Sequence, residues 1–451
     1  MTAVMRMMRG LQLSAVCLAL AVSAGQAAAA SRAGRGGAAR LVRVGEGWAR
    51  NQVNAVIFRR NSVVSHGRWQ YVAFYDAGAR VVLAKRKLGT GDWDVRRTQY
   101  TGDARDAHRS ISIAVDGEGF LHVVWNQHDS PLQYCRGLRP GSLELSAQTP
   151  MLGEKEGRVT YPEFYRLPAG GLLFLYRDGA SGGGNLVLNR YDVKTKRWAR
   201  LQERLLDGEG ERNAYWQAFV DAKGAIHLSW VWRETPDVAT NHDLCYAKSE
   251  DGGRTWLKST GEPYQLPITA ATAEYVLRIP QGSELINQTS MTADARGRPY
   301  VVSYWRPAGT RVPQYHLVYG DGRRWRTVQV TRRTTPFSLS GRGTRRIPVS
   351  RPQVVVNTRG GRPEVFVLFR DAERGERVSV ATCRDLPDGA CAVSDLTEEG
   401  VGMWEPTYDP EVWRVKRELH LFVQRVGQGQ GEGTEDIPAQ TVSILEWRPG
   451  R

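Results

Sequence analysis

Four polar residues have types and spacings that suit proton transfer beside a carboxylate: His108, His128, Tyr161 and Arg177. His and Tyr exchange protons when their pKa values are tuned, and Arg binds a carboxylate through a pair of parallel hydrogen bonds. Such a set fits β-elimination at a uronic acid, in which C5 loses a proton, the bond to O4 breaks and a 4,5-unsaturated uronate remains. A glycoside hydrolase would more usually present a pair of carboxylates, and no comparable pair occupies these positions.

The two histidines flank a predicted β-hairpin, "ISIAVDGEGFLHVVW". Its turn, "DGEG", spans residues 116–119, and residue 118 is the midpoint between His108 and His128. The two histidines are therefore predicted to face each other at the open end of the hairpin, where opposed Cβ atoms lie about 4.5–5.5 Å apart.

The next hairpin repeats this arrangement with different side chains. Tyr161 and Arg177 have residue 169 as their midpoint, which is also the centre of the turn "LPAGG" at 167–171. If neighbouring hairpins point their open ends to one face, all four side chains converge there. A β-bulge would shift this register.

The elements that must position these residues form an internal repeat of strand, Gly- or Asp-rich turn, and strand with an aromatic end. A spacing of 50 to 75 residues is room for four short strands, which indicates a propeller blade. Two β-sandwiches would not explain evenly spaced copies. The sequence predicts an all-β fold, a single seven-bladed β-propeller of four-stranded antiparallel blades over residues 41–451. The seven copies end at Tyr75, Trp125, Tyr176, Trp230, Trp305, Phe369 and Phe422.

Two further motifs are expected to be structural. "SEDGGRTW", Ser249–Trp256, resembles the Asp box of sialidase-like propellers, with Asp251 capping the turn and Trp256 packing between blades. His122 and His227 recur at the same point of "LHVVW" and "IHLSW", which favours packing over chemistry.

The N-terminus predicts export. Residues 1–30 have the basic start, apolar stretch and small-residue end of a cleavable signal peptide, and residues 31–40 look like a flexible basic leader. The formal net charge of +15 favours an acidic partner. We expect a periplasmic or secreted monomer that binds an acidic polysaccharide, with no nucleic acid partner and no membrane attachment after signal cleavage.

The four cysteines beyond the signal peptide predict one local disulfide, Cys383–Cys391, and two buried thiols, Cys135 and Cys245. His242 lies three residues before Cys245, but two ligands do not define a zinc site. The expected chemistry requires no cofactor, and a structural calcium or zinc ion has no assigned ligands.

Equivalent hairpin ends supply three candidate substrate-binding residues: Arg233, Asn287 and Arg306. Each could bind a carboxylate, a sulfate or sugar hydroxyls, and each could equally be a plain rim residue. Trp232 and Trp305 could stack on sugar rings, although Trp at strand ends more often packs between blades.

At the four central residues the chain resembles the propeller-type polysaccharide lyases, namely ulvan lyase families 24 and 25 and the related rhamnosyl-glucuronate lyases. The shared pattern is a His before the first strand, a second His in "HDSPLQY", and a Tyr and an Arg sixteen residues apart. "VNAVIFRRNSVVSHGRWQYVAFYD" and "LINQTSM" also resemble that group. The resemblance implies that Tyr161 is base and acid, that His108 or His128 shares the base role, and that Arg177 neutralises the uronate.

Two rival functions remain at this point. The Asp box and "LRIP", Leu277–Pro280, are similar to sialidase motifs, but sialidases place the Arg-Ile-Pro motif before their Asp boxes and here it follows. A non-catalytic carbohydrate-binding propeller is the second rival.

Overall fold

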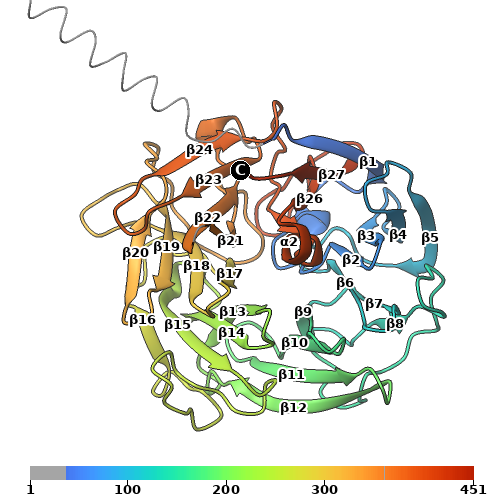
Figure 1. Ribbon diagram of the computed structural model, residues 1–451, viewed down its shortest axis with the longest axis horizontal. Helices are drawn as coiled ribbons and strands as arrows, with labels where there is room; N and C mark the ends of the chain where they lie inside the picture. Colours follow the sequence, from blue (N-terminus) through green and yellow to red (C-terminus); the bar gives the residue numbers. More distant parts are fainter. Residues whose placement is uncertain (1–36, 360, 451) are drawn as a thin grey trace, which may run out of the picture.

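The computed structural model describes residues 37–359 and 361–450, which form seven antiparallel sheets arranged in a ring (Figure 1). The predicted signal peptide and residues 31–36 of the predicted leader lie outside the described residues, and strand β1 begins at Arg40. Among the described helices, none is long and apolar enough to cross a membrane.

We number the blades 1 to 7 along the chain and give their strands from the ring centre outward. Blade 1 is β2 (Val63–His66), β3 (Trp69–Tyr75), β4 (Arg80–Lys87) and β5 (Asp94–Thr101). Blade 2 is β6 (Ile111–Val115), β7 (Leu121–Trp125) and β8 (Tyr134–Arg136). Blade 3 is β9 (Val159–Arg166), β10 (Leu172–Asp178), β11 (Asn185–Asp192) and β12 (Arg197–Leu206). Blade 4 is β13 (Asn213–Val220), β14 (Ile226–Arg233), β15 (Asn241–Ser249) and β16 (Glu274–Leu277).

Blade 5 is β17 (Ser290–Ala293), β18 (Pro299–Trp305), β19 (Gln314–Gly320) and β20 (Trp325–Gln329). Blade 6 is β21 (Gln353–Arg359), β22 (Arg362–Phe369), β23 (Ser379–Cys383) and β24 (Cys391–Asp395). Blade 7 is β25 (Thr407–Tyr408), β26 (Leu419–Gln424), β27 (Gln440–Trp447) and β1 (Arg40–Gly47). Because β1 from the start of the chain pairs with β27 from its end, this last sheet closes the ring.

The predicted seven-bladed propeller is therefore confirmed. Each of the seven aromatic residues that mark the repeat lies in the second strand of a blade, and all seven are buried. These side chains belong to the apolar clusters that hold the blades together, so the repeat in the sequence reflects the repeated packing of one strand.

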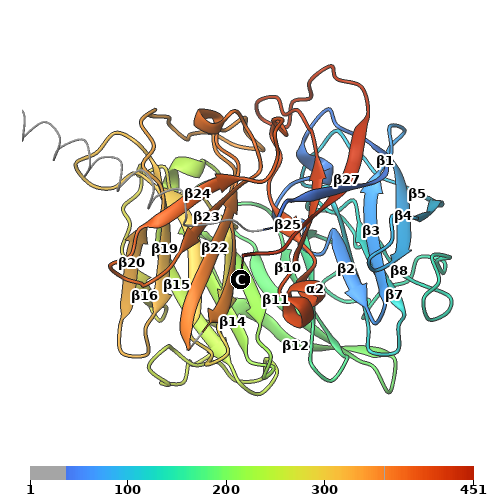
Figure 2. The same ribbon diagram turned by 45° about the horizontal axis from the view of Figure 1, so that its top comes forward.

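Two details differ from a regular set of four-stranded blades. The sheet of blade 2 has three strands, and an isolated bridge between Gly137 and Leu145 extends it. In blade 7 a short helix, α2 (Pro410–Lys416), replaces the turn between the first two strands. Asp409 caps this helix, Pro410 occupies its first turn, and both are typical of helix starts. Figure 2 shows α2 at the turn end of the blades.

The motifs assigned to structure have that role. Asp251 accepts hydrogen bonds from the backbone N–H groups of Arg254 and Thr255, and Trp256 is buried in an apolar cluster that spans blades 3, 4 and 5. His122 bonds Tyr134 and Asp116, and His227 bonds Tyr246 and Asp221 in the same manner. These two histidines are buried packing residues, as predicted.

The cysteines also follow the prediction. Cys383 and Cys391 form a disulfide that links β23 to β24, whereas Cys135 and Cys245 are buried free thiols. His242 bonds two carboxylates, Glu234 and Asp243, rather than sharing a site with Cys245.

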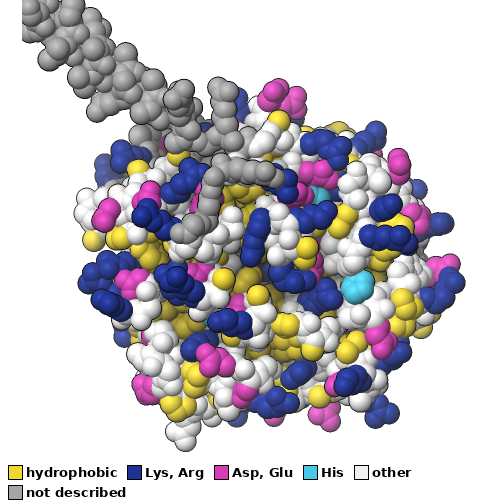
Figure 3. All heavy atoms as spheres, in the orientation of Figure 1, with side chains coloured by type: hydrophobic (Ala, Val, Ile, Leu, Met, Phe, Trp, Pro, Cys, Tyr) yellow, Lys and Arg dark blue, Asp and Glu magenta, His cyan; other side chains and the backbone are white. Residues whose placement is uncertain are grey.

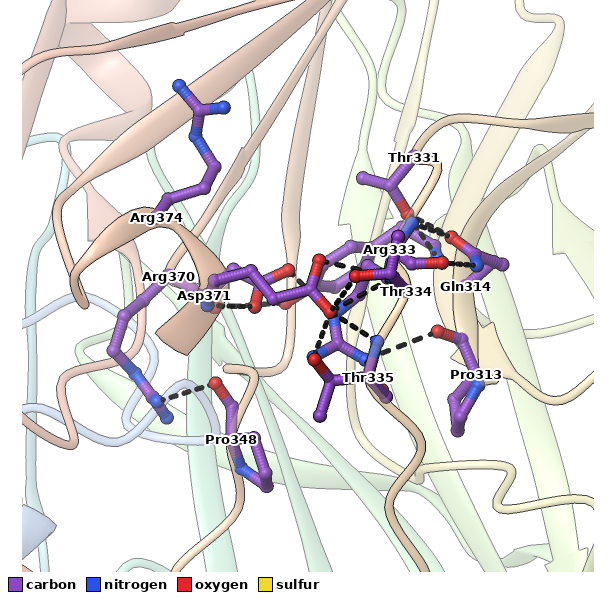
Figure 4. Close-up of polar contacts among 12 residues, drawn as sticks. Pro313, Gln314, Thr331, Arg333, Thr334, Thr335, Pro348, Arg370, Asp371 and Arg374 are labelled. Carbon is purple, nitrogen blue, oxygen red and sulfur yellow. Dashed lines mark hydrogen bonds and ion pairs between the residues drawn. The ribbon is translucent and has the colours of Figure 1, made fainter. Parts of the chain in front are cut away.

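Blades 5 and 6 are joined by a buried ion pair (Figure 4). Arg333, which follows β20, donates from Nε to Asp371 Oδ2 at 2.7 Å, and both side chains are 3% exposed. The Nη1 group of Arg333 donates to the carbonyl of Thr335, and Glu373 accepts from the backbone N–H groups of Thr334 and Thr335. The polar groups of this contact are therefore satisfied within the protein.

Candidate active site

The two histidines meet as the hairpin register predicted. The β6–β7 ladder ends with Ile111 opposite Trp125. Continuing the same register brings His108 and His128 together, and their rings stack with centroids 4.1 Å apart and planes inclined by 15°. On its other face His108 stacks on Phe58, with centroids 5.3 Å apart.

Two carboxylates that the sequence analysis missed hold the histidine pair. Asp106 bridges the rings, at 2.6 Å from His128 Nδ1 and 3.3 Å from His108 Nδ1. Glu432, from the loop between β26 and β27, lies 2.9 Å from His108 Nδ1. Because an ionised carboxylate only accepts hydrogen bonds, each Nδ1 carries a proton, and no described residue bonds either Nε2.

The surroundings give the two rings different charges. Burial alone would lower the pKa of His108, but attraction to Tyr161 and Glu432 and hydrogen bonds to Asp106 and Glu432 raise it well above its usual range. Burial and the neighbouring charge of His108 lower the pKa of His128. Burial would raise the pKa of Asp106, but the two histidines hold it well below its usual range. These opposite shifts favour an imidazolium at His108 and a neutral ring at His128.

Tyr161 reaches the histidines through a β-bulge. The predicted pairing of Tyr161 with Arg177 is wrong by one residue, because Arg177 pairs with Thr160 and the register shifts before Leu175 pairs with Glu163. Tyr161 has φ +56°, a strained left-handed conformation for a residue with a side chain. Bulges re-aim side chains next to active sites. Here the bulge places the Tyr161 ring 5.6 Å from that of His108.

Arg177 still joins the cluster despite the shifted register. Its guanidinium lies over the Tyr161 ring, 5.0 Å from the centroid, and its Nε donates to the carbonyl of Gly179. The side chain is buried, and its Nη1 has no hydrogen-bond partner among the residues that the structure describes. A buried guanidinium with a free N–H group is suited to bind an incoming anion such as a carboxylate.

Tyr215, on β13 of blade 4, is a further member that the sequence analysis did not name. It lies between two guanidinium groups, 6.0 Å from that of Arg177 and 4.4 Å from that of Arg233. Burial would raise the pKa of Tyr215, but Arg233 and Arg177 lower it to about 7. The repeat holds a signal for it, because Tyr161 and Tyr215 each lie fifteen residues before the aromatic that marks their blade, Tyr176 and Trp230.

Of the three candidate substrate-binding residues, the structure brings two together. Arg233 donates to Asn287 Oδ1 at 2.7 Å and contacts Tyr215, so both adjoin the site. Arg306 is instead paired with Glu284 at 2.6 Å and makes no described contact with the cluster. Trp232 and Trp305 are buried and cannot stack on a sugar without rearrangement.

Among the described residues, one group of three has metal-binding side chains within 4.8 Å of one another: Asp106, His108 and His128. The donor atoms of that group already bond one another or Glu432, so hydrogen bonding accounts for the arrangement. The sequence analysis also named "LRIP" as similar to a sialidase motif. Its Arg278 follows β16, the outermost strand of blade 4, and pairs with Asp243.

Fold and site together define a seven-bladed propeller with a polar cluster at the open ends of the hairpins of blades 2 to 4. The model of the BNR repeat-containing family matches residues 69–333, which is more than half of the chain. The chain therefore belongs to this family.

Curated relatives include ulvan lyases. The chain is 23% identical to the long isoform of an ulvan lyase from Alteromonas sp. and 25% identical to that from Pseudoalteromonas sp. (strain PLSV), each over 328 residues. Each match covers 57% of this chain and 33% of the relative, so the chain spans about a third of the length of these proteins.

Solved structures share the fold. The crystal structure of polysaccharide lyase Uly1 superposes with a TM-score of 0.67 at 14% identity, covering 92% of this chain and 99% of the other. A PL25 ulvan lyase bound to GlcA(1-4)Rha3S superposes with a TM-score of 0.57 at 15% identity, covering 79% of this chain and 96% of the other.

Proposed function

We propose that this protein is a polysaccharide lyase that cleaves a uronic-acid polysaccharide, ulvan-like or rhamnosyl-glucuronate, by β-elimination. The observation that carries the proposal is the convergence of His108, His128, Tyr161 and Arg177 in one cluster. The similarity to ulvan lyases supports the same reaction class and substrate.

The geometry supports a division of roles. Arg177 binds the uronate carboxylate through its free Nη1, and the imidazolium of His108 adds positive charge as negative charge develops on that carboxylate. Tyr161 and neutral His128, whose Nε2 is free, remove the C5 proton and return a proton to O4. The electrons of the C5–H bond form the C4=C5 double bond as the C4–O4 bond breaks. Arg233 and Asn287 would contact neighbouring sugar or sulfate groups.

The proposed reaction uses no metal or organic cofactor, since side chains supply the charge and the proton transfer. A chelator is accordingly expected to leave activity unchanged. Export by the predicted signal peptide, to the periplasm or the medium, and action as a monomer belong to the same proposal, because a polymeric substrate lies outside the cytoplasm.

A substrate panel tests the proposal. The protein is incubated with ulvan, gum arabic and other glucuronate polymers while the ultraviolet absorbance of the unsaturated uronate is followed. Rising absorbance on at least one polymer is the expected result. Binding without absorbance would favour the non-catalytic propeller, and release of sialic acid from a reporter glycoside would favour the sialidase. Either outcome would refute the lyase.

A further inference from the structure

Glu432 reaches the histidine pair from a different blade. It lies in the loop 425–439, which joins β26 to β27 in blade 7, within the sequence "QGQGEGTE". The histidines and Asp106 belong to the segments that flank the first hairpin of blade 2. A side chain from the closing blade thus reaches a site built on blades 2 to 4.

The Glu432 carboxylate contacts two segments at once, residues 107–108 and the backbone of Thr344. Its Oε1 forms an ion pair with His108 Nδ1 at 2.9 Å and accepts from the backbone N–H of Thr344, and its Oε2 accepts from the backbone N–H of Ala107 at 3.1 Å. The backbone N–H of Glu432 in turn donates to the carbonyl of Thr344. Contacts on both oxygens fix the carboxylate, so its position against His108 is not left to a flexible side chain.

The neighbouring residue Gly343 allows this approach. A Cβ at Gly343 would lie 3.2 Å from Glu432 Oε1 and 3.2 Å from the Gly431 backbone, and Gly343 has φ +71°. Any larger residue would press on the carboxylate. The loop 330–352, between β20 and β21, is therefore shaped to receive Glu432.

Three charged or ionisable groups besides Asp106 distinguish the two rings: Glu432 and Tyr161 face His108, and Arg177 disfavours a positive charge on His128. Asp106 is shared between His108, His128 and Arg109. Tyr161 faces His108 from blade 3, and the guanidinium of Arg177 lies over the Tyr161 ring. Two stacked imidazoles 4.1 Å apart resist carrying two positive charges. Because Glu432 is the one carboxylate that contacts His108 and not His128 among the described residues, it favours protonation of His108 over His128.

We propose that Glu432 is a positioning residue whose carboxylate fixes His108 through Nδ1 and makes His108, rather than His128, the charged ring of the pair. His128 is thereby kept neutral, with Nε2 available for proton transfer. The kinetic consequence rests on the proposed lyase function, whereas the assignment of charge does not.

The test compares Glu432→Gln with Asp436→Asn. The first variant loses the charge and keeps one acceptor oxygen, which can accept from the backbone N–H of Thr344 or of Ala107. The second makes the same change of charge in the same loop, at a side chain that is fully exposed and touches only Arg50 among the described residues. The imidazole resonances of His108 and His128 are assigned with His108→Gln and His128→Gln and then titrated by NMR.

In Glu432→Gln, the pKa of His108 measured by this titration is expected to fall by about one unit or more, because the carboxylate that favoured its protonation has lost its charge. The pKa of His128 is expected to rise. In Asp436→Asn, the pKa values of both histidines are expected to match those of the wild type. An unchanged His108 titration in folded Glu432→Gln would overturn the proposal. If that variant does not fold, Glu432→Asp serves as the second variant, because it keeps the charge at a greater distance. The pKa of His108 is then expected to lie between the usual histidine value and that of the wild type. A His108 pKa equal to that of the wild type would overturn the proposal.

Kinetics give a second readout if the lyase activity is found. Glu432→Gln should lower kcat about tenfold with KM within about twofold, since a charge acting in the transition state is lost. The alkaline limb of the pH profile should move to lower pH, because His108 loses its proton earlier. Absence of lyase activity in the wild type would refute the proposed function and leave the NMR test intact.

Discussion

Aromatic rings and guanidinium groups alternate across the candidate site. Arg177 lies over Tyr161, Tyr215 lies beside Arg177, and Arg233 lies over Tyr215. Arg233 and Arg177 both favour the ionised form of Tyr215. The result is a row of groups that can hold an anion and exchange protons near neutral pH.

The first prediction concerns Tyr215, whose pKa is about 7. Since this pKa is lowered, the phenolate is present above pH 7 and is lost as the pH falls below it. Ultraviolet titration of the wild type should show one tyrosinate forming near pH 7, and Tyr215→Phe should remove it. If no tyrosine ionises until near pH 10, the ordinary value, the electrostatic description of the site is wrong.

Residue types and hairpin midpoints were enough to predict that His108 and His128 meet and that Tyr161 and Arg177 lie near them, although the pairing of Tyr161 with Arg177 is wrong by one residue. They could not reveal Asp106 and Glu432. Asp106 lies two residues before His108 and outside any predicted strand, so alternation along a strand could not predict where its side chain points. Glu432 is more than 300 positions away in a Gly-rich loop. Only the folded ring brings that loop to blade 2.

At the scale of elements, contacts between blades position the site. The backbone N–H of Asp129 donates to Thr160 Oγ1 at 2.7 Å, and Ser130 pairs with Val159, so the segment that carries His128 is tied to β9, which carries Tyr161. The bulge in β9 then turns Tyr161 toward the histidines. Alternation along the strand alone gives no sign of this bulge, which is why the predicted pairing was wrong by one residue.

The buried contact between blades 5 and 6 supplies a stability prediction. Asp371→Ala leaves Arg333 buried without its carboxylate and should lower the free energy of unfolding by about 3–5 kcal/mol. Denaturant unfolding measures this loss. Asp385→Ala removes a carboxylate from an exposed pair with Arg362 in the same blade and should change stability little. Equal losses in the two variants would contradict the role given to the buried pair.

At the scale of the whole molecule, the repeat of aromatic strand ends was enough to predict the number of blades, because each aromatic packs at the same point of every sheet. Closure of the ring by β1 joins residues about 400 positions apart, which no local pattern records. Lys and Arg side chains outnumber acidic ones, with a formal net charge of +15, and they are spread over the face seen in Figure 3.

This charge predicts that ionic strength affects capture of an acidic polymer. Raising salt from about 50 mM to about 500 mM should lower kcat/KM about five- to tenfold, mainly through KM, because screening shortens the reach of the positive field. Steady-state kinetics on the polymer at several salt concentrations measure the effect. A kcat/KM that does not depend on salt would argue against electrostatic attraction by the whole surface.

The central claim is that the cluster of His108, His128, Tyr161 and Arg177 breaks a uronate linkage by elimination rather than hydrolysis. The most direct measurement is mass spectrometry of the fragments from an ulvan oligosaccharide of known length. The account predicts two fragments whose masses sum to that of the substrate, one ending in an unsaturated uronate, with the rate lowered about 100-fold or more in Tyr161→Phe. Fragments whose masses sum to the substrate plus one water, or a substrate that binds and stays intact, would contradict it.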